Sequence, residues 1–227
     1  APYELTTTSY VDRNISRLTP ANYYAKIFAM AMKSMRRSTV GMIFNGDGQA
    51  TNDMFGVKTA KNMAGSPIYA NLDVEEVGPD LLTELMFAYG GDEELGGNCR
   101  LYLNKKDLLA LGKLRGTNEK QRLFDIVPDA ANPNTGTIRE GGTIVPYSIS
   151  SKLTALSASE KGSSAIQTMV YGDPMNYELG LFGPYTVRVD ESVKAVERML
   201  TILGDAMVGG NLIVDKGFVV ATLPANG

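Results

Sequence analysis

The sequence predicts an α+β fold on three observations. Apolar residues at helical spacing mark three segments in the first half of the chain. Runs of β-branched and aromatic residues, which are typical of strands, dominate the second half. Helices and strands do not follow one another in the regular order of a doubly wound parallel sheet. The 227 residues are enough for one large domain or two small ones.

The first predicted helix covers residues 19 to about 38. Thr19 can cap its N-terminus, and Pro20 suits the first helical position. One broad face carries apolar residues at helical spacing: Tyr24, Ile27, Phe28, Ala31, Met32 and Met35. We expect this face to pack in the core of the subunit.

Two large apolar residues of the same helix, Tyr23 and Met30, fall outside that face and lie beside Lys26, Lys33 and Arg37. Single exposed apolar residues are common in soluble proteins, and this explanation stays open. The alternative is a contact with another protein chain. Tyr23 and Met30 are therefore candidate subunit-interface residues.

A compact basic cluster, Lys33, Arg36 and Arg37, lies toward the end of the same helix. Cations at a helix C-terminus interact favourably with the helix dipole, which is one explanation for the cluster. Contact with nucleic acid phosphates is the other. The sequence leaves both open.

The segments that follow are shorter. Residues 41–56 are rich in glycine and short polar side chains, which predicts a loop. A second helix fits residues 79–89, because leucines recur on one side and Gly90 can end it. The apolar run CRLYL, residues 99–103, predicts a strand, and Asn104 can cap a third helix, KKDLLALGKL.

The second half of the chain is expected to be mostly strands. Residues 125–142 are rich in Pro, Asn, Gly and Thr, which predicts an exposed loop with a turn at 132–136. For residues 193–203 both periodicities fit, and we expect a helix first and then a strand. Strands are predicted at residues 143–149, 166–171, 185–189 and 218–223.

The composition argues against most enzymatic sites. The chain has no histidine, the commonest general base and metal ligand. Its one cysteine, Cys99, allows no internal disulfide and no cysteine-based zinc site, and we expect it to be a buried apolar residue. A formal net charge of -3 provides no global attraction to nucleic acid. We expect no catalytic residue, no cofactor, no metal and no membrane contact.

Two motifs have simpler explanations than a binding site. Gly46 and Gly48 begin a GxGxx pattern, but Thr51 replaces the third glycine and the segment follows a helix. The adjacent carboxylates Glu75 and Glu76 diverge on either a strand or a helix, so they do not form a catalytic pair by themselves. Ordinary turn chemistry and solvated charge account for both.

Four segments, in order, resemble the major capsid proteins of tailed bacteriophages, which share the Hong Kong 97 (HK97) fold. They are IFNGDGQATNDMFGV, LYLNKKDLLALGKLRG, VYGDPMNYELGLFGPYTVRVDES and NLIVDKGFVVATL. The resemblance implies an HK97-like fold with a long spine helix, a peripheral domain and an axial domain. The domain boundaries expected from it are residues 1–66 for the peripheral domain, 67–207 for the axial domain, and 208–227 for a strand returning to the peripheral domain.

The resemblance also implies a function. Copies of the chain would self-assemble into pentamers and hexamers that enclose a phage genome, without catalysis or cofactors. The expected partners are copies of the chain, other capsid or portal proteins, and packaged DNA through weak non-specific contact. The expected location is the virion, after assembly in the cytoplasm of the bacterial host.

The sequence departs from the family pattern at two points. Too little chain precedes the first helix for both an extended arm and a long β-hairpin loop, so we expect these parts to have been removed, disordered or omitted. The Lys and Asn that cross-link subunits in some members have no match by motif. Two alternatives stay open: the shell of an encapsulin-type bacterial compartment, and a carboxylate-based hydrolase.

Overall fold

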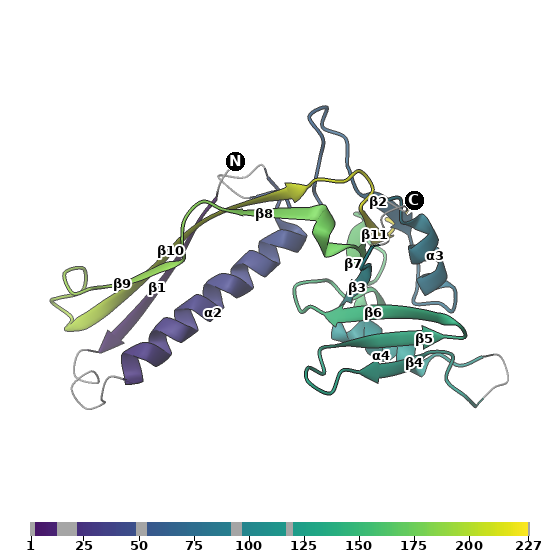
Figure 1. Cartoon of the computed structure of the whole chain (residues 1–227), viewed down its shortest axis with the longest axis horizontal. Coiled ribbons are helices and arrows are strands. Elements are labelled where there is room, and N and C mark those ends of the chain that lie inside the picture. The colour runs from purple at the N-terminus through teal and green to yellow at the C-terminus, as the bar shows by residue number, and fades with distance from the viewer. Residues whose placement is uncertain (1–2, 13–21, 49–53, 92–96, 117–119, 227) are drawn as a thin grey trace. The chain divides into compact units, whose positions relative to one another are not determined.

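The computed structural model describes residues 3–12, 22–48, 54–91, 97–116 and 120–226 (Figure 1). Contacts between residues divide the chain into two compact units. The first unit combines residues 1–56 with 179–211, and the second combines residues 57–178 with 212–227. Helices and sheets are both present, which confirms the α+β class.

The first unit consists of a long helix and a four-stranded sheet. The helix is α2 (Asn22–Asn45). The strands are β1 (Tyr3–Asp12), β8 (Tyr177–Leu181), β9 (Thr186–Asp190) and β10 (Met199–Leu212). β10 is central and pairs antiparallel with β1 and with β9. Figure 1 shows α2 running alongside β1 and β10.

Side chains of β1 and β10 pack on α2 from one face of the sheet. Leu5 and its cross-strand partner Ala206 are buried in one apolar cluster with Met35 of α2. Gly204 is required at this contact, because a Cβ there would lie 2.6 Å from Thr7 Cγ2 and 2.8 Å from Met35 Sδ. Close packing between this face of the sheet and α2 therefore depends on the absence of a side chain at position 204.

α2 is longer than the sequence predicted. The expected end was Ser38, but the helix continues to Asn45. Thr39 Oγ1 donates a hydrogen bond to Met35 O, and both Thr39 and Phe44 are buried. Packing of this last part stabilises helix where glycine and short polar residues alone would favour a loop.

The expected core face of α2 is confirmed in part. Ala31 and Met35 are buried, whereas Ile27, Phe28 and Met32 are only half-buried. Thr19 and Pro20, which were expected to begin the helix, lie outside the described residues. So do the side chains of Tyr23 and Tyr24.

The glycines of the GxGxx pattern permit a close backbone approach. Gly46 N donates to Met42 O at 2.8 Å, and Gly56 N donates to Gly46 O at 2.9 Å. A Cβ on Gly46 would collide with the carbonyl oxygen of Met54, and one on Gly56 would lie 2.7 Å from Gly46 N. The backbone amide of Gly46 is thus engaged within the chain itself.

We therefore expect Gly46→Ala to destabilise the first unit by about 2–3 kcal/mol, because the colliding atom is backbone and cannot rotate away. Gly183→Ala is the matched control, since a Cβ there meets nothing within 4 Å. Urea unfolding followed by circular dichroism would measure both. Equal stability of the two variants would show that the Gly46 contact is not tight.

The second unit is built around a seven-stranded mixed sheet. Its strand order is β2-β11-β7-β3-β6-β5-β4, with β2–β11 and β3–β6 parallel. The strands are β2 (Ala70–Asp73), β3 (Arg100–Leu103), β4 (Asp125–Pro128), β5 (Thr135–Glu140), β6 (Thr143–Ile149), β7 (Ile166–Gly172) and β11 (Phe218–Leu223). The helices are α3 (Leu81–Ala88) and α4 (Lys105–Lys113), and two short 3-10 helices are η2 (Leu156–Ala158) and η3 (Pro174–Asn176).

Several predicted elements of this unit are confirmed. α3 and α4 lie within their expected ranges, and Asn104 caps α4 by accepting a hydrogen bond from Lys106 N. β3, β6, β7 and β11 also match within about one residue. β11 is buried along its whole length, as its unbroken apolar sequence suggests.

The loop predicted for residues 125–142 is wrong, because β4 and β5 occupy most of it. Ile126 and Ile138 face each other across this strand pair, and Ile138 is fully buried. The turn-forming residues are confined to the connection, where Thr135 N donates to Asn132 O. One buried and one half-buried isoleucine outweigh a loop-like composition.

The helix predicted at the start of residues 193–203 is also wrong. Residues 191–198 form a turn, and β10 begins at Met199. The cause is long-range: β10 pairs with β1 along ten residues, from Met199 to Val208. β1 was not predicted from the sequence, so the strand that pairs with this segment was not recognised.

The two units do not coincide with the expected domain boundaries of 1–66, 67–207 and 208–227. Residues 179–211 belong to the first unit, since β10 pairs with β1. Residues 212–227 belong to the second unit, since β11 pairs with β7 and β2.

Candidate assembly surfaces

The outward face of α2 carries four cations and an exposed methionine. Met30 is 70% exposed, and Lys26, Lys33, Arg36 and Arg37 are exposed as well. The 24 residues of α2 include no Asp or Glu. The helix therefore has a charge of +4 within a chain whose formal net charge is -3.

These cations are not neutralised within the described part of the chain. Its salt bridges are Lys161–Glu75, Arg188–Asp205 and Lys194–Glu197, none of which involves α2. The dipole explanation of the basic cluster also fails, because α2 ends at Asn45 and its last turn has no basic residue. Free cations in the middle of a helix are available to an external partner.

Met30 lies on the rim of an open groove between α2 and β1, which we call the α2–β1 groove. Its volume is about 470 Å³. The lining residues are Thr7, Ser9 and Val11 of β1 and Lys26, Ile27, Met30, Ala31 and Ser34 of α2. The structure thus gives Met30, the candidate interface residue, a place in a recessed and largely apolar surface. Tyr23, the other candidate, has its side chain outside the described residues.

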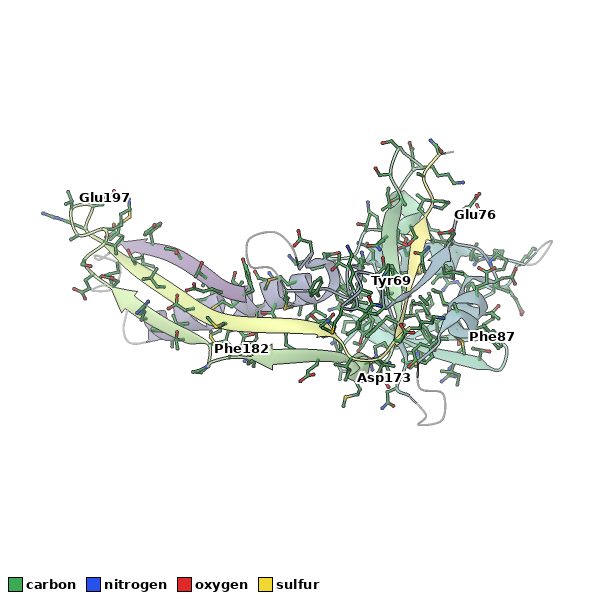
Figure 2. All side chains as sticks on the ribbon, turned by 90° about the horizontal axis from the view of Figure 1, so that it is seen from above. Tyr69, Glu76, Phe87, Asp173, Phe182 and Glu197 are labelled. Carbon is green, nitrogen blue, oxygen red and sulfur yellow. The ribbon has the colours of Figure 1, made fainter. Side chains whose placement is uncertain are left out.

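A second apolar surface of the first unit is the turn between β9 and β10, which we call the tip turn (residues 191–198). Val196 is 99% exposed and Val193 is 59% exposed. Figure 2 shows Glu197 at this end of the two strands. This surface was not predicted from the sequence, because the two valines, three residues apart, fit one face of a helix.

The second unit also presents large apolar side chains to solvent. Phe87 of α3 is 85% exposed (Figure 2). Met63 lies in a short loop closed by hydrogen bonds from Asn62 N to Ser66 O and from Ile68 N to Ala60 O. Met175 and Ile144 are further examples. Apolar groups held out by ordered elements are typical of surfaces that become buried in an assembly.

Buried polar groups of the second unit serve the fold. Asp107 of α4 accepts hydrogen bonds from Leu156 N and Ser157 N. Asp173 accepts from Asn98 N and Met175 N, which fixes the end of β7 against the start of η3. Both oxygens of each carboxylate are thus hydrogen-bonded to backbone amides of the same chain.

The half-buried Cys99 is not an activated nucleophile. Burial raises the pKa of its thiol, and burial likewise raises the pKa of the neighbouring Tyr171 to about 12. The protonated thiol is the less reactive form. Among the described residues, no group of three His, Cys, Asp or Glu side chains could hold a metal ion. No described helix is long and apolar enough to cross a membrane.

Several solved structures share this fold. A chain from the capsid of an empty GTA particle superposes with a TM-score of 0.72 at 15% identity, covering 98% of this chain and 74% of that one. Gordonia phage Cozz gives 0.64 at 15% identity, covering 99% and 71%. The holo-SrpI encapsulin complex from Synechococcus elongatus PCC 7942 gives 0.64 at 13% identity, covering 100% and 75%. These similarities confirm the HK97-like fold, which defines a class of shell-forming proteins.

The sequence places the chain more narrowly within that class. The profile of the Phage capsid family matches residues 1–223, and the chain belongs to this family. No curated protein sequence matches it significantly. The protein is therefore a structural shell subunit and a component of a virion, as the sequence resemblance predicted.

Proposed function

We propose that copies of the chain form pentamers and hexamers that close into an icosahedral shell around a phage genome. The observation that carries the proposal is the presence of exposed apolar side chains on ordered elements of both units, such as Met30, Val196 and Phe87, in a member of the Phage capsid family. Many modest interfaces, repeated by symmetry, are sufficient to close a shell. In this proposal the first unit is the peripheral domain and the second is the axial domain.

The basic cluster of α2 (Lys33, Arg36 and Arg37) is proposed to contact the packaged DNA. These three cations, which form no salt bridge with other described residues, can neutralise phosphates without reading sequence, which gives weak, salt-dependent binding. The rest of the chain is net negative, so this attraction stays local. Other capsid or portal proteins are further proposed partners, and assembly in the host cytoplasm without catalysis completes the proposal.

The charge of α2 yields a direct prediction for DNA binding by unassembled subunits. Replacing Lys33, Arg36 and Arg37 by Gln is expected to weaken binding of a short duplex. It should also reduce the slope of log K against log salt by up to about 3, one for each lost phosphate contact. Fluorescence anisotropy at several salt concentrations would measure this slope.

The matched control removes three exposed cations elsewhere. Lys105, Lys106 and Lys113 lie on α4 of the second unit and are exposed. Their replacement by Gln changes the net charge equally but is expected to leave the slope nearly unchanged. If both triple variants reduce the slope alike, DNA responds only to the total charge and α2 is not a specific contact surface.

An encapsulin-type compartment is the second candidate, supported by the similarity to the SrpI encapsulin. The two functions differ in content, since one shell would contain nucleic acid and the other a protein cargo. Purified particles treated with nuclease and then opened would distinguish them. Protected DNA supports the phage capsid, whereas a second protein in place of DNA supports the compartment.

A further inference from the structure

We propose that the tip turn of one subunit docks into the α2–β1 groove of a neighbouring copy. The inference rests on the proposed function, because it names one of the contacts by which the shell would be built. Both surfaces belong to the first unit, and each is described by residues of that unit alone.

The tip turn is preorganised. Asp190 Oδ1 accepts hydrogen bonds from Ser192 N at 2.8 Å and Ser192 Oγ at 2.6 Å. Arg198 N donates to Ala195 O, and Met199 N donates to Lys194 O, both at 3.1 Å. A turn that is already ordered loses little conformational entropy when it binds.

The exposed apolar side chains of the tip turn have no partner within it. The side chains of Lys194 and Glu197 form an ion pair at 2.6 Å, so these charges have a partner within the turn. Val193 and Val196 have none, because both are exposed at its surface. Two valines held out by a rigid, internally bonded turn are suited to insertion into an apolar recess.

The α2–β1 groove has the complementary character. Val11, Ile27 and Ala31 provide apolar walls, and the hydroxyl groups of Thr7 and Ser9 can rotate to meet polar atoms. A volume of about 470 Å³ accommodates more than one side chain. Lys26 is the one charged residue among the eight that line it.

Charge does not oppose this pairing. Residues 191–198 contain two carboxylates (Glu191 and Glu197) and two cations (Lys194 and Arg198), so the tip turn has no net charge. The groove contributes one cation, Lys26. The contact therefore brings no excess of like charge together.

The geometry of β1 indicates that the occupant comes from another copy. Lys194 Nζ lies over the ring of Tyr10, 5.5 Å from its centroid, whereas the next residue, Val11, lines the groove. Successive strand residues point to opposite faces of a sheet. The tip turn therefore contacts the face of β1 that is opposite to the face lining the groove of the same subunit.

The positions of the groove and the tip turn also allow the contact to repeat from one copy to the next. The pairs Val11↔Leu200 and Asp12↔Met199 place the groove end of β1 beside the strand that leaves the tip turn. Groove and tip turn thus lie at the same end of the unit. Each copy can insert its tip turn into the next copy, and such a heterologous contact closes into a small ring when the rotation permits.

Cysteine cross-linking tests the contact in assembled particles of the intact protein. One batch carries Val196→Cys, a second carries Met30→Cys, and the two are mixed before assembly and then oxidised. We expect a disulfide-linked dimer in particles and none in dissociated subunits. The natural Cys99 is the background control, measured in the parent protein, and Met63→Cys mixed with Met30→Cys is the control for random collision.

Each other result overturns the inference while leaving the proposed function intact, provided that electron microscopy shows shells. Dimers formed by Val196→Cys alone would mean that tip turns meet one another. Particles without the mixed dimer would mean that the groove has another occupant. If no particles form even for the parent protein, the proposed function itself fails.

Thiol accessibility gives an independent readout. In Met30→Cys a soluble maleimide is expected to react at least tenfold faster in dissociated subunits than in particles, because the docked turn covers the rim of the groove. If the thiol reacts slowly in both subunits and particles, the groove is closed within the subunit. If it reacts fast in both, the groove stays open in the shell. Both outcomes contradict the inference.

Charged substitutions at the two surfaces should impair assembly without unfolding the subunit. Val196→Asp and Met30→Glu would each place a carboxylate in an apolar contact, and we expect at least a tenfold loss in particle yield. Val196→Leu keeps the contact apolar and should assemble normally. Normal assembly of Val196→Asp would contradict the inference.

Discussion

Replacing Asp107 by Ala is expected to destabilise the second unit by about 3–5 kcal/mol. The side chain is fully buried, and its two oxygens accept from Leu156 N at 3.0 Å and Ser157 N at 2.8 Å. Hydrogen bonds to a charged acceptor contribute about 1.5–3 kcal/mol each, and the substitution leaves the amide of the buried Leu156 without its partner. The bonds also join α4 to η2, so their loss separates two elements distant in sequence.

Urea unfolding followed by circular dichroism measures this effect in unassembled subunits. Lys106→Ala is the control, because Lys106 lies beside Asp107 on the same helix but is exposed. Its effect should stay within about 0.5 kcal/mol. If Asp107→Ala costs no more than the control, water replaces the carboxylate and the link between α4 and η2 is unimportant for stability.

The stability of the second unit is expected to rise with pH above about 8 because of Lys58. The side chain is 5% exposed, and its Nζ donates to the backbone oxygen of Gln167 at 3.0 Å. Burial lowers the pKa of Lys58 from 10.5 to about 8. Between these two pH values the unfolded chain binds the proton and the folded chain does not, so raising the pH favours folding.

The size of the effect follows from the pKa difference. It corresponds to about 3 kcal/mol gained between pH 7 and pH 10.5, as an upper estimate. Comparing the wild type with Lys58→Met at both pH values isolates the contribution of this amine. Lys58→Arg should be less stable than the wild type at both, because its guanidinium stays charged. A wild-type advantage over Lys58→Met that does not change with pH would contradict the account.

The elements that could be predicted from sequence are those determined by local signals. α3 and α4 have leucines on one face, and Asn104 carries its own capping side chain. β11 is an unbroken apolar run. In each case the residues that determine the element lie within it or next to it.

The elements that could not be predicted depend on distant partners. β1 contains four consecutive polar residues, Thr6 to Ser9, and it is a strand because it pairs with β10, about 190 residues later. Without β1, the segment before β10 fitted a helix equally well. The strands β4 and β5 could not be predicted for the same reason, since Ile126 and the buried Ile138 pair only across a turn of polar residues.

The same distinction between local signals and distant partners applies to the candidate surfaces. Helical spacing alone identified Met30 and the cluster of Lys33, Arg36 and Arg37 as lying outside the core, and the structure places all four at the surface. The tip turn was missed because its exposure depends on β10 being a strand. Helix periodicity can show which side chains face outward, but not which tertiary turn presents them.

Electron microscopy of the intact natural protein, purified over a range of concentration and salt, tests the central claim most directly. The account predicts closed shells built from rings of five and six subunits, in which the chain forms the wall. A protein that remains monomeric under every condition would contradict it.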